Sequence, residues 1–230
     1  MLRGPIFVLF DFFTGNAGIM DVVIRFFAVL VILFVIFPVH ECAHALAAKW
    51  LGDKTAERAG RITLNPFAHI DPMGAIFMFI MSFGWAKPVP VNPRNCHKVG
   101  IKAAVSLTAA AGPISNVIMS LLCIIIAKTI LVISPNPAME YVSLAFRITA
   151  QLSVYLAVFN LIPIPPLDGS KILFFFLKDK QVFFMEKNAN IIRLVFLALI
   201  FFPPYILSTA ISFVGGFILM GLDLITWFIK

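Results

Sequence analysis

Residues 21–51 read DVVIRFFAVLVILFVIFPVHECAHALAAKWL, an apolar run that passes without a break into a more polar, alanine-rich end. The first part, Val22–Val39, is almost wholly apolar. A helix needs about 20 apolar residues to cross the hydrocarbon of a bilayer. We therefore predict one long helix over Asp21–Leu51, which crosses a membrane and carries its polar end near one surface.

The composition of the whole chain agrees with a membrane protein. Of the 230 residues, 61% are hydrophobic and 13% are charged, and the mean hydropathy is +1.00. Soluble domains are typically 45–50% apolar with about 25% charged residues. With only three cysteines, the chain is not a disulfide scaffold either. The expected fold class is an all-α membrane protein, a polytopic bundle of four to six transmembrane segments.

The rest of the chain divides into apolar and polar segments. Met73–Trp85 is apolar but too short to span, which favours a re-entrant or β-hairpin-like segment. The prolines of Lys87–Pro93 exclude a helix there and predict an extended loop. The remaining predictions are long helices over Ile101–Ile133 and Tyr141–Ile162, a short helix over Asp168–Lys178, a polar loop over Lys178–Lys187, and Ile191–Ile229 as a hairpin or as one short segment plus one span, broken at Pro203-Pro204.

Basic residues gather in or beside three loops: Lys49, Lys54, Arg58 and Arg61 in the first, Lys87, Arg94, Lys98 and Lys102 in the second, and Lys171, Lys178, Lys180 and Lys187 in the third. The net charge is +7, and these loops alternate with Ser134–Met139, which has no lysine or arginine. By the positive-inside rule, the basic loops are expected in the cytoplasm. The charge is thus attributed to the lipid surface, and no nucleic-acid partner is expected.

The polar end of the first long helix contains His40-Glu41-Cys42-Ala43-His44, an H-E-x-x-H pattern. Residues four apart share one helix face, so His40 and His44 can hold one metal ion. Glu41 stands beside the first ligand, where a carboxylate can take a proton from metal-bound water. Cys42 points to the opposite side and is not expected to be a ligand. The pattern predicts one catalytic Zn²⁺ ion.

A catalytic zinc site needs a third protein ligand. Asp168 is the strongest candidate, since it follows the proline-rich run Asn160–Leu167 and precedes Gly169, which allows close backbone approach. An aspartate here could instead cap the next helix. The spacing alone leaves both interpretations open.

Taken together, these motifs resemble the site-2 protease family of intramembrane zinc metalloproteases, in its compact branch without PDZ or CBS domains. The resemblance rests on His40–His44 and Asn160–Gly169, and it covers about residues 22–178. Further matching stretches are Gly60–Pro66, His69–Pro72, Gly84–Pro93 and Ala111–Asn116. The resemblance implies that His40, His44 and Asp168 bind zinc and that Glu41 is the catalytic base. Residues 1–230 are expected to form one metalloprotease domain, with a catalytic core at about 21–178 and a C-terminal helical segment or hairpin at about 188–230.

Three further polar residues have two interpretations each. By resemblance, Asn160 and Asn116 would hold the substrate backbone or an oxyanion. Alternatively, each bonds a neighbouring helix. His69 either adds a polar group to the cleft or belongs to the turn between Asn65-Pro66 and Asp71-Pro72.

The expected function is hydrolysis of a peptide bond within or near a transmembrane helix, in regulated intramembrane proteolysis. The resemblance implies a transmembrane protein or a remnant signal peptide as substrate, and separate membrane proteins as regulators. The expected location is a prokaryotic plasma membrane, with the active site towards the cytoplasm. A metal-dependent transporter or channel would also explain intramembrane His and Asp residues, although the chain lacks the internal repeat of many transporters.

Overall fold

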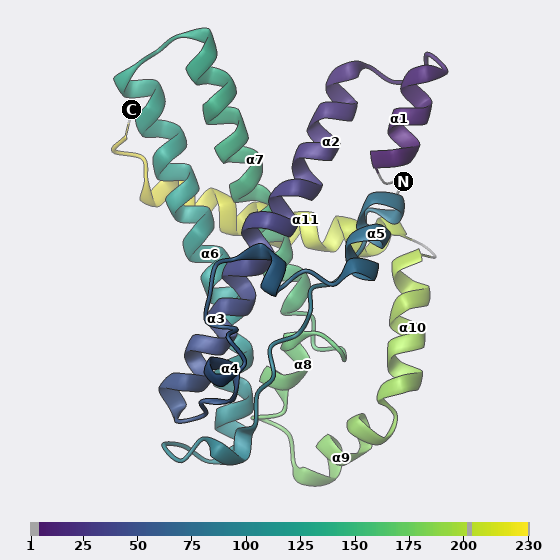
Figure 1. Cartoon of the computed structure of the whole chain (residues 1–230), viewed down its shortest axis with the longest axis vertical. Helices are drawn as coiled ribbons and strands as arrows, with labels where there is room; N and C mark the ends of the chain where they lie inside the picture. The colour runs from purple at the N-terminus through teal and green to yellow at the C-terminus, as the bar shows by residue number, and fades with distance from the viewer. Residues whose placement is uncertain (1–4, 202–203, 230) are drawn as a thin grey trace.

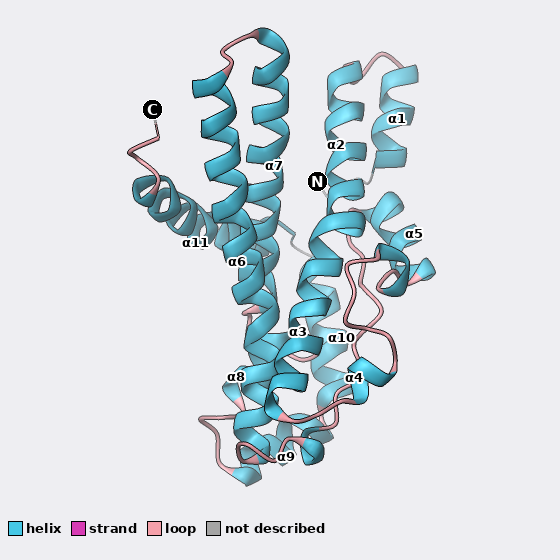
Figure 2. Ribbon diagram, turned by 60° about the vertical axis from the view of Figure 1, so that its left-hand side comes forward, coloured by secondary structure: helices cyan, strands magenta, loops and turns pink. Residues whose placement is uncertain are grey.

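The computed structural model describes residues 5–201 and 204–229, and all regular elements among them are helices. Figure 1 shows two long arms that diverge towards one end, one made by α1 and α2 and the other by α6 and α7. At the opposite end, α3, α4, α8 and α9 gather around the start of α6 (Figures 1 and 2). The helices are α1 Pro5–Phe13, α2 Ile19–Val31, α3 Phe37–Leu51, α4 Thr55–Arg58, α5 Pro72–Met81, α6 Ile101–Ile133, α7 Pro137–Asn160, α8 Asp168–Leu173, α9 Asp179–Lys187, α10 Ala189–Phe201 and α11 Pro204–Ile225.

Four helices are long and apolar enough to cross a membrane, namely Ile19–Leu51, Ile101–Ile133, Pro137–Asn160 and Tyr205–Ile225. The first confirms the predicted long helix. It contains a π-helical turn, Ile32–Ile36, which joins α2 to α3. It ends at Gly52, whose φ of 114° is the left-handed conformation that glycine adopts at helix ends.

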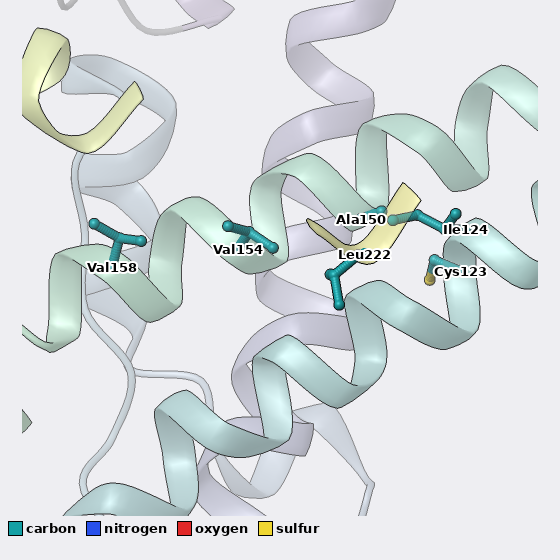
Figure 3. Close-up of a cluster of buried hydrophobic side chains, with 6 residues drawn as sticks. All are labelled: Cys123, Ile124, Ala150, Val154, Val158 and Leu222. Atoms are coloured by element: carbon teal, nitrogen blue, oxygen red, sulfur yellow. The ribbon is translucent and has the colours of Figure 1, made fainter. Parts of the chain in front are cut away.

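The pair α6 and α7 forms the central hairpin (Figure 1). Hydroxyl groups of α7 bond backbone carbonyls of α6: Ser143 Oγ donates to Ala127 O at 2.9 Å, and Ser153 Oγ donates to Asn116 O at 2.8 Å. Small hydroxyl residues let two membrane helices approach closely. The pair also packs against α11, whose Leu222 belongs to an apolar cluster with Ile124, Val154 and their neighbours (Figure 3).

One segment differs from its sequence prediction. Lys178–Lys187 is not a loop, because Asp179–Lys187 forms α9, whose first turn is capped by Gln181 Oε1 accepting from Lys178 N–H at 2.9 Å. Its charges indicate exposure rather than loop structure. Met73–Trp85 contains the short helix α5, after which the chain returns antiparallel to the segment before it, with one bridge between Ile70 and Ala86 but no strand among the described residues.

The C-terminal region follows the alternative of one short segment plus one span, α10 and α11. Pro203 of the predicted break lies outside the described residues. A cluster around Leu167, Phe196 and Ile200 packs α10 against the segment that leads into α8. The C-terminal region therefore forms part of the surroundings of Asp168.

Candidate metal centre

The ligand atoms of His40, His44 and Asp168 meet at one point between α3 and α8. The two Nε2 atoms lie 3.1 Å apart. Asp168 Oδ2 lies 3.2 Å from Nε2 of His40 and 3.1 Å from Nε2 of His44. All three residues are buried. Tetrahedral zinc with bonds of 2.0–2.2 Å separates its ligands by about 3.3 Å, so this triangle fits such an ion closely.

The helix α6 supplies the surroundings that orient both imidazole rings. Nδ1 of His44 lies 2.7 Å from the carbonyl oxygen of Thr108, which can only accept. Nδ1 of His44 therefore carries the proton, and Nε2 is left with its lone pair towards the triangle. A hydrogen bond of this kind on the far nitrogen is the usual companion of a metal-bound histidine.

Asn116 of α6 stands behind His40 in the same way. Its amide nitrogen lies 3.2 Å from His40 Nδ1, and its fully buried oxygen Oδ1 has no hydrogen-bond partner among the described residues. A 180° turn of the amide would exchange its two polar atoms and bring Oδ1 onto Nδ1–H of His40 as an acceptor. Nε2 of His40 then also faces the triangle unprotonated, as a metal ligand requires.

Gly112, also on α6, lies against both rings. A Cβ atom at this position would lie 2.5 Å from His40 Cε1 and 2.5 Å from His44 Nε2. No side chain other than hydrogen fits there without moving the rings. At Asp168, the neighbouring Gly169 confirms the predicted close backbone approach, because a Cβ there would collide with the carbonyl oxygens of Leu161 and Ile162.

Glu41 lies on the wall of a cleft of about 810 Å³ that also contains His40, His44 and Asp168. The extended segment Gly84–Pro93, which we call the strap, also lines this cleft. Glu41 Oε2 accepts a hydrogen bond from the backbone N–H of Val89 at 3.0 Å. The carboxylate of Glu41, the three candidate ligand atoms and the strap thus share one cleft.

The far end of the strap is fixed by Asp53, a fully buried carboxylate just after α3. It accepts hydrogen bonds from Asn92 N–H at 2.6 Å, Thr55 N–H at 3.0 Å and Asn95 Nδ2 at 3.1 Å. Burial alone would raise the pKa of this carboxyl, but these hydrogen bonds outweigh it and hold the pKa below its ordinary value. Asp53 therefore stays ionised at neutral pH and anchors the strap to the end of the ligand-bearing helix.

The other sequence candidates lie in different surroundings. Asn160 lines the cleft, and its Nδ2 donates to the carbonyl oxygen of Leu156 at 3.0 Å. Asn116 lies behind His40 rather than on the cleft wall. His69 is fully buried outside the cleft lining, with Nε2 at 2.8 Å from the carbonyl oxygen of Thr63. The contact between Glu41 and the strap had no signal in the sequence.

Two comparisons with known proteins agree with each other. A model described as Peptidase family M50 matches residues 126–203, which include Asp168. YwhC of Bacillus subtilis, named as a candidate zinc metalloprotease, is 41% identical over 151 residues, which are 63% of this chain and 66% of YwhC. The chain belongs to peptidase family M50.

Two mycobacterial relatives extend the comparison. Rip2 of Mycobacterium tuberculosis H37Rv is 31% identical over 169 residues, 72% of this chain and 62% of Rip2. Rip2 of Mycolicibacterium smegmatis is 31% identical over 133 residues, 56% of this chain and 49% of Rip2. Both are named as candidate zinc metalloproteases. The chain thus spans about half to two thirds of the length of these relatives, and no solved structure matches it significantly.

The role of Asn116 in the candidate site can be tested. Replacement of Asn116 by leucine is expected to weaken zinc binding by about 10–100-fold, the usual effect of losing an outer partner of a metal-bound histidine. Asn116→Asp keeps an acceptor for His40 Nδ1–H and should bind zinc nearly as the wild type does. Competition with a zinc chelator measures both affinities. Equal losses in the two variants would show that the amide does not act as this acceptor.

Proposed function

We propose that the chain is an intramembrane zinc metalloprotease that hydrolyses a peptide bond within or near a transmembrane helix of a membrane-protein substrate. One observation carries the proposal: the triangle of His40, His44 and Asp168 faces the same cleft as Glu41. A metal transporter requires ligands but has no use for a carboxylate adjacent to the first of them.

Each residue of the site has its own proposed role in the reaction. His40, His44 and Asp168 would hold one zinc ion, which supplies Lewis acidity to the scissile carbonyl and to a water molecule. Glu41 accepts the proton of the attacking water and returns it to the leaving amine. We propose that Asn160, on the cleft wall, holds the substrate backbone with the N–H that it does not donate to Leu156.

The proposed substrate is a single-span membrane protein or a remnant signal peptide. Such a helix hides its carbonyl groups in backbone hydrogen bonds, so it must unwind before the cleft can receive it. The four apolar helices support a multi-pass location, and the bacterial relatives support a prokaryotic plasma membrane. The basic loops favour a site near the cytoplasmic side.

Metal removal tests the proposal directly. The purified chain, reconstituted in liposomes with a single-span substrate, should cleave it. Treatment with a chelator is expected to reduce cleavage to background, and Zn²⁺ should restore it. Mg²⁺, which prefers oxygen ligands in octahedral geometry, should not.

The same liposomes separate the alternatives. Zinc-dependent ion flux without cleavage would favour a transporter or channel. Capture of the substrate helix with no turnover at any zinc concentration would favour a binding protein. Either result would overturn the protease proposal.

A further inference from the structure

The peptide group between Pro88 and Val89 is hydrogen-bonded at both ends by charged side chains. Its N–H, on Val89, donates to Glu41 Oε2 at 3.0 Å. Its carbonyl oxygen, on Pro88, accepts from Nη1 of Arg61 at 3.2 Å. One peptide group therefore links the carboxylate of Glu41 to a guanidinium that does not touch it.

Arg61 is built into this position. Arg61 is only 7% exposed, and its Nη2 also donates to the carbonyl oxygen of Lys87. The planar guanidinium can hold two adjacent carbonyls at once, which the single ammonium of lysine does less well. Two further hydrogen bonds anchor the strap on either side of this stretch. Lys87 N–H donates to His69 O at 2.7 Å, and Asn92 N–H donates to the carboxylate of Asp53. Arg61 therefore fixes the stretch of strap that faces Glu41.

The chemistry of the link favours an effect on Glu41. A positive charge on the carbonyl oxygen draws electrons from the peptide group, which makes its N–H a stronger donor to the carboxylate. With Oε2 held by Val89, the other oxygen, Oε1, has no partner among the described residues and is free to meet water. A glutamate without this bond has several rotamers, most of which turn the carboxylate away from the reacting atoms.

We propose that Arg61 is a positioning residue for Glu41, acting through the Pro88–Val89 peptide group. The inference rests on the proposed protease function. Arg61 touches neither substrate nor metal. It holds the N–H that sets the direction of the catalytic carboxylate, so its loss lowers turnover more than substrate binding.

The test is a double-mutant cycle on zinc-loaded protein in liposomes. Arg61→Met removes the charge, and Val89→Pro removes the N–H. Val89→Ala keeps the N–H and gives the baseline for the side chain. Arg58→Met removes a nearby exposed charge on α4 and should cleave as the wild type does.

Arg61→Met and Val89→Pro are each expected to lower kcat by about 10–100-fold, the cost of a misplaced catalytic group. KM should stay within about threefold, and the zinc content should remain one ion per chain. Because both changes remove the same link, the double variant should be no slower than the slower single variant. If each residue instead had a purely structural role, the loss of kcat in the double variant would be the product of the two single losses.

Each alternative outcome is decisive. Multiplied losses, or an Arg61→Met variant as active as Arg58→Met, would overturn the inference. If Arg61→Met does not fold, the kcat of Val89→Pro is compared with that of Val89→Ala. Equal kcat values in these two variants would overturn the inference. An inactive wild type would overturn the protease proposal instead.

Discussion

Replacing Glu41 by glutamine is expected to lower kcat by about 10²–10⁴-fold, the usual contribution of a general base. Glutamine has nearly the same shape and can still accept the hydrogen bond from Val89 N–H, but it cannot take a proton from water. Glu41 is not part of the His40, His44 and Asp168 triangle. The variant should therefore keep one zinc ion per chain and still bind substrate.

The measurement is single-turnover cleavage in liposomes together with the zinc content of the same sample. Glu57→Gln is a matched control, since Glu57 lies on α4 and pairs with Lys49 at the surface, where such pairs contribute little. Cleavage by Glu41→Gln at the wild-type rate would remove Glu41 from the mechanism. Loss of zinc in this variant would point to a structural role.

Gly112→Ala is expected to abolish zinc binding at ordinary concentrations, and cleavage with it. The added methyl group would lie 2.5–2.6 Å from ring atoms of both histidines, including both Nε2 atoms. Ring atoms and a methyl carbon pack at about 3.5–4.0 Å, so both rings must move away. The triangle of ligand atoms, with edges near 3.1–3.2 Å, cannot survive a shift of this size.

Gly216→Ala on α11 is the control, because a Cβ there meets nothing within 4 Å. In a helix interior this change adds up to about 1 kcal/mol of stability, so it should not reduce zinc content. Zinc content and thermal unfolding of both variants separate loss of the site from loss of the fold. A Gly112→Ala protein that holds one zinc ion would contradict the close approach of α6 to the histidines.

The sequence predicted the parts of the site that follow from local spacing. His40 and His44 share a helix face because they are four residues apart, and the apolar run before them fixed their helix. The lengths of Ile101–Ile133 and the preceding long helix also followed from hydropathy. Asp168 lies 124 positions after His44. Its proline-rich and glycine neighbours made it the strongest candidate for the third ligand, but only the resemblance favoured a ligand over a helix cap.

The rest depends on contacts between distant segments. Asn116 and Gly112 act on the histidines because α6 crosses α3 at their level, and no helical periodicity reveals that crossing. Arg61 lies in a polar loop, and its two carbonyl acceptors are 26 and 27 residues further along the chain. The prediction of a polar loop over Lys178–Lys187 was wrong, because a polar composition does not reveal the capping contact of Gln181 that begins α9.

The π-helical turn Ile32–Ile36 lies between α2 and the part of the same continuous helix that bears His40 and His44. Each residue of an α-helix turns the chain by about 100°, and a π turn holds one residue more than an α turn. The angular phase of the membrane-crossing half is thereby offset from the phase of the half that bears His40 and His44. The face that α2 presents to its neighbours is therefore rotated about the helix axis relative to the face of α3 that bears His40 and His44.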